Sequence, residues 1–583
     1  MERDRAIVSL ERFVVYFVAL AWGALQAWNS RYELFFADSQ QYFDMAYYFS
    51  QGEFAKTVSL YWSPLYPMVA GLLLKLFPAP AYWQFFQFKL VNLGILLATF
   101  VSFDFFFGQL YAYYSSAIVA EDTERAVIGK NALRFCGYAL LLLFSLAFGG
   151  VYQDTPDMLA AALFFLSSGL FLKLLTKPTK LAACLFGFSC GFGYLAKAVM
   201  FSLTALYLVL MSTSLLRRKV VCIVLAAACF ALIAAPWVWL MSSKAEHFSI
   251  GESAKFVYIN LVEERDPVSA EGLIHPPPIL HRDPLVRAFG HEIPGTCPFF
   301  YDIGYWTQGA IAHVRISDLV RVIGLNTIYY IQTFLYIPFL IVALIAIRTR
   351  SWPVPARSLW RAAPVLLPPL ALCAQYALVS NLYVTTYVNR YFIAAFPVAI
   401  LAILIAIRVP KEKFPKLLHR AVVLTTCLCL ASAFSSRFLY DLSECFKEQH
   451  HLWYNVSAAL KGDGIKYGDD VAILGCRIHR NSQFAEAEKL RIVASIWQEE
   501  LFWQQTPAQR REVLDIVRRA GARAVVYSRV PDLEDSLFAQ NLILIQQLFN
   551  LKLQMPFKNY PAPTDLTGWK QVPGSEVYYY LLF

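Results

Sequence analysis

The chain has 583 residues, of which 58% are hydrophobic and only 16% charged, and its net charge is +10. Soluble domains usually carry about 25% charged residues, so the composition excludes a soluble globular protein, and its long apolar runs indicate membrane-spanning helices. The positive charge does not indicate nucleic-acid binding, because most of it lies in short loops between apolar runs, as the positive-inside rule predicts.

Eleven apolar segments are expected to be transmembrane helices. They lie at residues 13–28, 83–108, 135–148, 158–175, 181–195, 201–216, 220–241, 325–347, 362–379, 392–407 and 421–434. A further apolar stretch, 67–77, is too short for a bilayer that needs about 20 residues, and is expected to lie at the membrane interface.

One orientation satisfies all the short loops. With the N-terminus in the cytoplasm, every connection rich in Lys and Arg falls inside. Residues 31–82 then form a first outer loop, and residues 242–324 form a large outer loop. We expect a polytopic membrane domain over residues 1–434.

The tail from 435 to 583 has a different character. It is charged and its apolar runs are short, with buried-strand patterns at 470–475, 522–528 and 576–583. Thr506 is a suitable N-cap for a helix that extends to about residue 520. Strand, helix and strand predict a small α/β domain, which eleven spans would place outside the cytoplasm.

Four groups of polar residues share the predicted outer side of the membrane. They are Asp38 with Asp44, Asp154 with Asp157, Lys197, and Asn389-Arg390-Tyr391. Each alone is explained by a snorkelling or solvated side chain. Acids and bases at one depth on different helices, however, are what a buried polar site requires, so the first outer loop is interpreted as an active-site loop.

Short motifs connect this pattern to a family. They are Asp38, Tyr42, Ala46 and Gly52, then Pro64, Tyr66 and Pro67, Thr155-Pro156-Asp157, Gly193 to Lys197, Pro236-Trp237, Arg390-Tyr391 and Pro397. On these residues the chain resembles the polytopic glycosyltransferases of the C superfamily. The similar branch is family 39-like, with the protein mannosyltransferases and the aminoarabinose and galacturonic acid transferases. The resemblance covers most of residues 10–440 and does not specify the sugar.

The resemblance implies transfer of a sugar from a polyprenyl-phosphate donor to a lipid, glycan or protein acceptor, on the outer face of a bacterial inner membrane. Asp38 is then the expected base for the acceptor hydroxyl. Arg390 is the first and Lys197 the second candidate for the leaving phosphate. One-step displacement would invert the anomeric centre.

Other residues are expected to support this reaction. Tyr391, Tyr42, Tyr66 and Asp154 are candidate substrate-binding residues. The family often has an Asp-Glu pair in the first loop, but Ser39 follows Asp38 here. A second catalytic acid therefore stays open between Asp44, Asp154 and Asp157.

Two other functions compete with this interpretation. A transporter or flippase of a lipid-linked saccharide predicts charges at mid-membrane depth and helices broken in pairs, and only Lys89 and Asp104 are clear interior charges. A non-catalytic scaffold leaves the outer acids unexplained. No Walker phosphate loop or Gly-x-Gly-x-x-Gly sequence is present, which argues against a nucleotide-driven pump.

No cofactor is expected. The five histidines of the large outer loop leave a divalent metal open, but their spacing is not the paired spacing of metal ligands.

Overall fold

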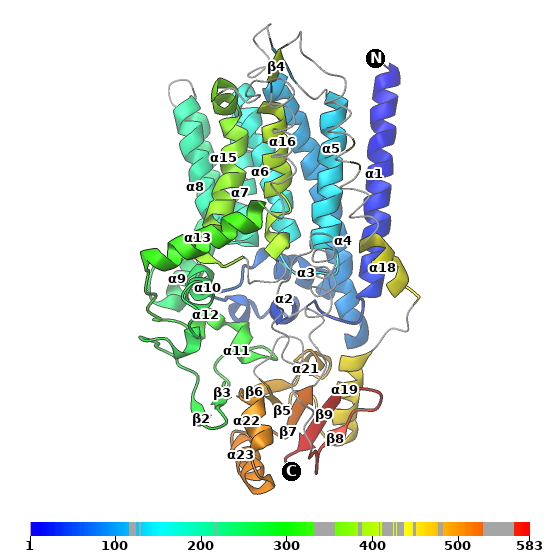
Figure 1. Cartoon of the computed structure of the whole chain (residues 1–583), viewed down its shortest axis with the longest axis vertical. Coiled ribbons are helices and arrows are strands. Elements are labelled where there is room, and N and C mark those ends of the chain that lie inside the picture. The colour runs from blue at the N-terminus through cyan, green and yellow to red at the C-terminus, as the bar shows by residue number, and fades with distance from the viewer. Residues whose placement is uncertain are drawn as a thin grey trace.

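The protein is described here from a computed structural model. The described residues are 2–35, 37–115, 124–126, 130–215, 219–331, 356–382, 388–406, 408–410, 424, 427, 437–446, 451–475, 482–528 and 565–583. Three layers follow one another along the long axis: a bundle of long helices, a middle layer of short helices, and a β-sheet with its own helices (Figure 1). The two termini lie at opposite ends of this stack.

Apolar helices form the bundle. Within the described residues, six helical segments are long and apolar enough to cross a membrane. They are α1 (Glu2–Asn29), α4 (Ala81–Tyr113), α5 (Lys130–Leu142) with its π-helical extension η3 (Leu143–Gly149), α6 (Asp157–Thr176), α9 (Val220–Ala245) and α15 (Ala356–Val379). The shorter apolar helices α7 (Lys180–Ala196), α8 (Val199–Leu215) and α16 (Ala395–Ala406) pack with them. These nine helices overlap nine of the predicted spans, so the protein is a helical membrane protein.

Two predicted spans have a different outcome. Helix α13 (Ile316–Tyr330) begins before the predicted start at residue 325, and lies obliquely against the end of the bundle (Figure 1). Residues 332–347 of that predicted span lie outside the described residues. So does the predicted span 421–434, apart from Leu424 and Cys427.

The middle layer contains most of the predicted first outer loop. Helix α3 (Leu65–Leu76) overlaps the apolar stretch 67–77, for which the sequence predicted a short helix. Between α1 and α3 lie α2 (Ala37–Ser50) and the short η1 (Phe54–Thr57), while α10 (Ser253–Leu261), η4 (Pro267–Ser269), α11 (Pro298–Tyr301) and α12 (Ile303–Trp306) come from the large outer loop. The sequence patterns do not predict α2, because polar residues such as Gln40 and Asp44 are buried along with its apolar ones and no apolar stripe results.

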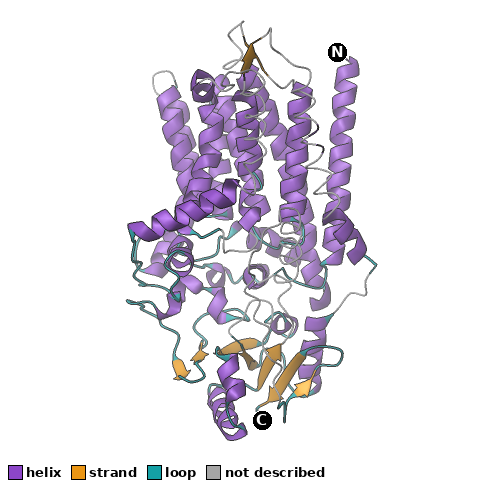
Figure 2. Ribbon diagram, in the orientation of Figure 1, coloured by secondary structure: helices purple, strands orange, loops and turns teal. Residues whose placement is uncertain are grey.

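The third layer is a seven-stranded sheet of order β2-β3-β6-β5-β7-β9-β8 (Figure 2). Its strands are β2 (Ile279–His281), β3 (Val286–Ala288), β5 (Asp470–Leu474), β6 (Arg491–Ile496), β7 (Ala524–Ser528), β8 (Lys570–Gln571) and β9 (Val577–Leu581). Strand β5 pairs in parallel with β6 and β7, and the other pairs are antiparallel. The three strands predicted in the tail are confirmed as β5, β7 and β9.

Helices surround this sheet. They are α19 (Leu452–Gly462), α21 (Phe484–Ala487), α22 (Glu499–Gln504) and α23 (Pro507–Arg519). The short helix α18 (Leu439–Glu444) instead packs against α1, where Asp441 Oδ2 accepts from the Trp22 indole at 2.7 Å. The predicted cap of α23 is confirmed, because the Thr506 side chain accepts from the Gln509 amide in a capping box. The sheet also takes β2 and β3 from the large outer loop, where Val286 faces Ile496. A separate ribbon, β1 (Glu124–Ala126) with β4 (Arg408–Pro410), lies at the other end of the molecule, near the N-terminus (Figure 1).

Candidate active site

Four charged side chains meet where the bundle joins the middle layer. Asp38 lies in the first turn of α2, Arg390 in the short helix η6 (Val388–Phe392), Asp157 at the start of α6, and Lys197 directly after α7. The Arg390 Nη2 donates to Asp38 Oδ2 at 2.8 Å, and its Nε lies 3.2 Å from Asp157 Oδ2. Lys197 Nζ is ion-paired with Asp157 Oδ1. We call this chain of alternating charges the arginine cluster.

The cluster has a closed centre and two accessible ends. The side chains of Arg390 and Asp157 are each only 4% exposed, whereas those of Asp38 and Lys197 are 25% and 22% exposed. A buried guanidinium between two carboxylates has little freedom to reorient. The two groups of the cluster that are most open to solvent are therefore one carboxylate and one ammonium, which are linked through Asp157 and Arg390.

Aromatic rings surround these charges. Lys197 Nζ lies 3.8 Å from the centroid of the Tyr391 ring, and Tyr391 stacks on Tyr376 with 4.8 Å between centroids. Such cation–π contacts favour the charged ammonium. Sequence reasoning missed Tyr376, because it lies inside an apolar helix and gives no local signal of its partner.

Electrostatics keep the hydroxyls protonated and the arginine charged. Burial raises the pKa of Tyr42 well above its ordinary value, and the nearby Asp38 and Asp157 add to the shift. Burial, with Asp38, does the same to the pKa of Tyr61, which was also missed from the sequence. Burial alone would lower the pKa of Arg390, but the surrounding anions raise it above its ordinary value. At neutral pH the site therefore presents a permanent cation and neutral phenols.

Asp154 has a separate, fully buried partner. It forms an ion pair with Lys89 of α4, accepts from Asn92 Nδ2 at 3.2 Å, and accepts from the Phe35 amide at 3.3 Å. Burial raises the pKa of Asp154 to about 6, against the opposing effect of Lys89. The carboxylate thereby ties the chain just before Asp38 to α4.

The second interior charge of α4 is also partnered. Asp104 lies 3.3 Å from the Arg12 Nε and accepts from the hydroxyls of Tyr16 and Tyr138. Together with the Lys89–Asp154 pair, this accounts for both interior charges that a transporter would use. Each is satisfied within the helix bundle.

Two candidate residues lie away from the arginine cluster. Asp44 is 1% exposed, and its carboxylate accepts from the amide and hydroxyl of Thr296 at 2.7 and 2.8 Å. Tyr66 is fully buried; its hydroxyl donates to Asn92 Oδ1 at 2.9 Å and its ring packs edge-on against Tyr42. Both side chains make contacts within the protein that hold the middle layer together.

The five histidines of the large outer loop are dispersed. His275 stacks on Tyr305 with 4.2 Å between ring centroids, and His291 lies 3.3 Å from Asp470. Among the residues that the structure describes, no three His, Cys, Asp or Glu side chains are grouped so that they could hold a metal ion.

Comparison with known proteins gives a structural likeness at low identity. No family model and no curated protein matches the chain. The structure is similar to ArnT from Cupriavidus metallidurans bound to undecaprenyl phosphate, at 13% identity and a TM-score of 0.44 over 95% of this chain and 96% of that one. It is also similar to the oligosaccharyltransferase AglB from Archaeoglobus fulgidus, in complex with an inhibitory peptide and a dolichol-phosphate, at 10% identity and a TM-score of 0.46 over 89% and 69%. TM-scores below 0.5 do not establish an activity, so the function has to be argued from the site.

Proposed function

We propose that this protein is a membrane glycosyltransferase that moves a sugar from a polyprenyl-phosphate donor to an acceptor hydroxyl on the extracytoplasmic side. One observation carries the proposal: a carboxylate and two cations from separate segments meet at one end of the helix bundle. An isoprenoid tail lies in the bilayer, so its phosphate would lie at the end of the spans, at the depth of this cluster.

The cations suit the phosphate of the donor. Arg390 presents a rigid fork that can bind two phosphate oxygens, and Lys197 adds a compact charge. As the sugar leaves, negative charge grows on the phosphate, and cations that are already in place stabilise that charge without reorganisation. Asp157 holds both cations, so we assign it a positioning role as the second acid.

Asp38 suits the role of general base. It is the accessible carboxylate at one end of the cluster, and the hydrogen bond from Arg390 holds it in place. In one step, the acceptor oxygen forms a bond to the anomeric carbon while the bond from that carbon to the phosphate oxygen breaks. The acceptor proton goes to Asp38 and the bonding pair goes to the polyprenyl phosphate. Attack opposite the leaving group inverts the anomeric centre.

The location follows from the same arrangement. The predicted topology puts the N-terminus in the cytoplasm. Helix α2, which carries Asp38, lies in the middle layer, at the end of the bundle away from the N-terminus (Figure 1). The site and the C-terminal α/β domain would then lie outside, in our assignment at the bacterial inner membrane. The acceptor would be a hydroxyl of a lipid, glycan or protein.

A donor panel tests the proposal. The purified protein in nanodiscs is incubated with a set of undecaprenyl-phosphate-linked sugars and candidate acceptors, and release of undecaprenyl phosphate is measured. We expect release with at least one sugar, its loss in Asp38→Asn, and its retention in Asp515→Asn, which alters an exposed acid of α23. Full activity of Asp38→Asn would remove Asp38 from the mechanism, and movement of the intact donor without release would indicate a flippase.

A further inference from the structure

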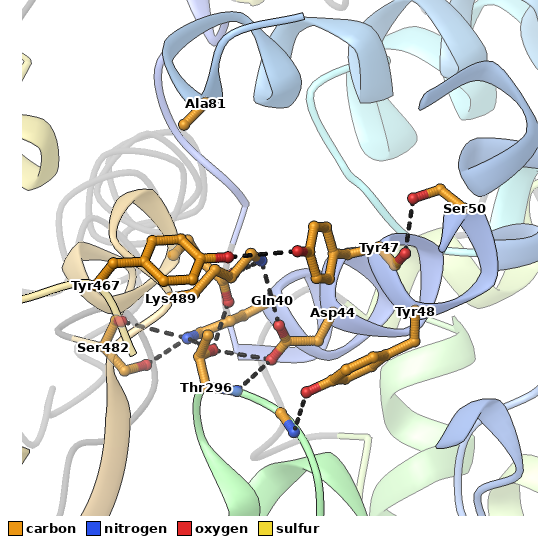
Figure 3. A network of polar contacts seen from close by, with 12 residues as sticks. Gln40, Asp44, Tyr47, Tyr48, Ser50, Ala81, Thr296, Tyr467, Ser482 and Lys489 are labelled. Atoms are coloured by element: carbon orange, nitrogen blue, oxygen red, sulfur yellow. Dashed lines mark hydrogen bonds and ion pairs between the residues drawn. The ribbon is translucent and has the colours of Figure 1, made fainter. Parts of the chain in front are cut away.

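A second polar cluster binds another face of α2 (Figure 3). It consists of Asp44, Thr296, Glu486 and Lys489, and we call it the threonine cluster. Thr296 Oγ1 lies 2.8 Å from Asp44 Oδ2 and 2.6 Å from Glu486 Oε1. Lys489 Nζ lies 2.8 Å from Glu486 Oε2 and 3.5 Å from Asp44 Oδ1. Three segments that are distant in sequence are thereby joined inside the protein.

The segment that carries Glu486 holds the chain on both sides of Asp38. Before Asp38, the Gln483 side chain accepts from the Leu34 amide at 3.0 Å and donates to the Leu34 carbonyl at 2.9 Å. After Asp38, the Ser482 hydroxyl donates to Gln40 Oε1 at 2.5 Å, and the threonine cluster binds Asp44. A clamp at both ends of the first turns of α2 leaves Asp38 little freedom to move.

If both carboxyl groups are ionised, the contacts around Thr296 lack one hydrogen. The Thr296 hydroxyl has a single hydrogen, yet two carboxyl oxygens lie within hydrogen-bond distance of it. The Thr296 hydroxyl oxygen also accepts from Gln40 Nε2 at 2.9 Å. All three contacts are satisfied if Thr296 donates to Asp44 while a protonated Glu486 donates to Thr296.

We propose that the threonine cluster positions Asp38, by fixing α2 to the sheet layer, and that it does so only while Glu486 carries a proton. This role rests on the proposed function, since it takes Asp38 as the base. Glu486, Thr296 and Lys489 are positioning residues that act through α2. The cluster makes the reaction depend on contact between the sheet layer and the membrane bundle.

Lys489 has an unusual backbone conformation. Its φ is 48°, in the left-handed region where residues other than Gly and Asn are uncommon. A long cationic side chain kept at such a position indicates that its placement matters. The ammonium supplies the one positive charge that faces both Asp44 and Glu486 within the cluster.

The charges around Glu486 place its titration near neutral pH. Burial raises its pKa to about 7, Asp44 adds to the shift, and Lys489 opposes it. The other titratable groups that face the cluster are Tyr47 and Tyr48 of α2, Tyr301 of α11, Tyr454 of α19, Tyr467, Cys297 and Arg491. Above pH 7, two buried carboxylates share one lysine and one hydroxyl hydrogen, and the clamp on α2 weakens.

Two pairs of matched variants test the proposal. Glu486→Gln keeps a donor for Thr296 and an acceptor for Lys489, whereas Glu486→Leu keeps neither. Thr296→Ser keeps the hydroxyl that Thr296→Val removes. With the undecaprenyl-phosphate sugar that the wild type uses, we expect Glu486→Leu and Thr296→Val to lower kcat by roughly 10- to 100-fold with little change in KM, since small misplacements of a catalytic group cost this much. Glu486→Gln and Thr296→Ser should stay close to wild type.

The pH profile gives a readout that a merely structural role would not move, and amide exchange reports the clamp on α2 directly. Wild-type kcat should fall as pH rises through about 7, and this fall should be absent in Glu486→Gln. Amides of residues 37–50 should exchange faster in Glu486→Leu than in Glu486→Gln, with or without substrate. Wild-type kcat and exchange in Glu486→Leu would overturn the proposal. If no donor is turned over by the wild type, the proposed function fails, and the exchange comparison alone decides the clamp.

Discussion

Two aspartates on one short helix have opposite surroundings. Asp38 is a quarter exposed and accepts from the Arg390 guanidinium, whereas Asp44 is almost fully buried and accepts from a hydroxyl and an amide of the large outer loop. Both are carboxylates of α2, six residues apart. The difference teaches that exposure and partner, rather than residue type or position in a loop, separate a group that can react from a group that holds the fold.

The largest effect should come from removing the exposed carboxylate. Asp38→Asn should lower the transfer rate by about 10²- to 10⁴-fold, the usual contribution of a general base. Its unfolding temperature should stay near wild type, because the amide can still accept from Arg390. Rates from released polyprenyl phosphate and a thermal melt check this. A smaller effect than that of Asp44→Asn would reverse the comparison of the two aspartates.

A large loss of stability is expected at the buried pair beneath the arginine cluster. Lys89→Met leaves Asp154 buried without its cation, which typically costs about 3–5 kcal/mol. Denaturant unfolding of the solubilised protein measures the loss. The double variant Lys89→Met/Asp154→Leu should recover much of it, and no recovery would show that the two residues do not act as a pair.

Arg390→Lys should weaken donor binding by roughly 10-fold, because a lysine keeps the charge but loses the planar fork. The affinity for undecaprenyl phosphate, measured with the enzyme in nanodiscs, checks this. Arg518→Lys, an exposed change on α23, is the matched control. Unchanged affinity in Arg390→Lys would place the phosphate elsewhere.

The threonine cluster predicts a pH-dependent stability. The folded-state pKa of Glu486, about 7, lies above its unfolded value of 4.5, so the folded state binds the extra proton between these values. Wild-type stability should therefore fall as pH rises from about 4.5 to about 7 and level off above that. Glu486→Gln should lack this fall. Melting temperatures of the two proteins across this range measure the difference, which should widen toward pH 7.

The smallest effect is expected within the middle layer. Tyr66→Phe removes one buried hydrogen bond to Asn92 and should cost about 1 kcal/mol of stability. Denaturant unfolding, with Tyr467→Phe as an exposed control, measures it. A loss as large as that of Lys89→Met would mean that the hydroxyl organises more of the layer than this bond.

The sequence predicted the parts of the fold that repeat a simple pattern. Long apolar runs located the nine described bundle helices, and short apolar runs located β5, β7 and β9, because burial on both faces of a strand leaves a continuous apolar run in the sequence. The meeting of Asp38 with Arg390 was also predictable, since positive-inside counting put both on one side. Their roles remain proposals.

Other features left no such trace. Helix α2 buries polar and apolar residues together, and β2 and β3 are three residues long in a proline-rich segment. The partners of Asp44 lie more than two hundred residues away, in segments with no motif of their own. Long-range pairing of this kind depends on tertiary contacts that single-sequence patterns do not encode.

The strand β3 also constrains how the protein is made. It pairs with β6, which the ribosome synthesises only after the last apolar helices of the bundle. Until then the β2–β3 hairpin has an open edge that invites pairing with other chains. A truncation that ends after the bundle would leave this edge permanently uncovered, so we expect such a fragment to aggregate, whereas coexpression with the missing tail could restore a soluble complex in detergent.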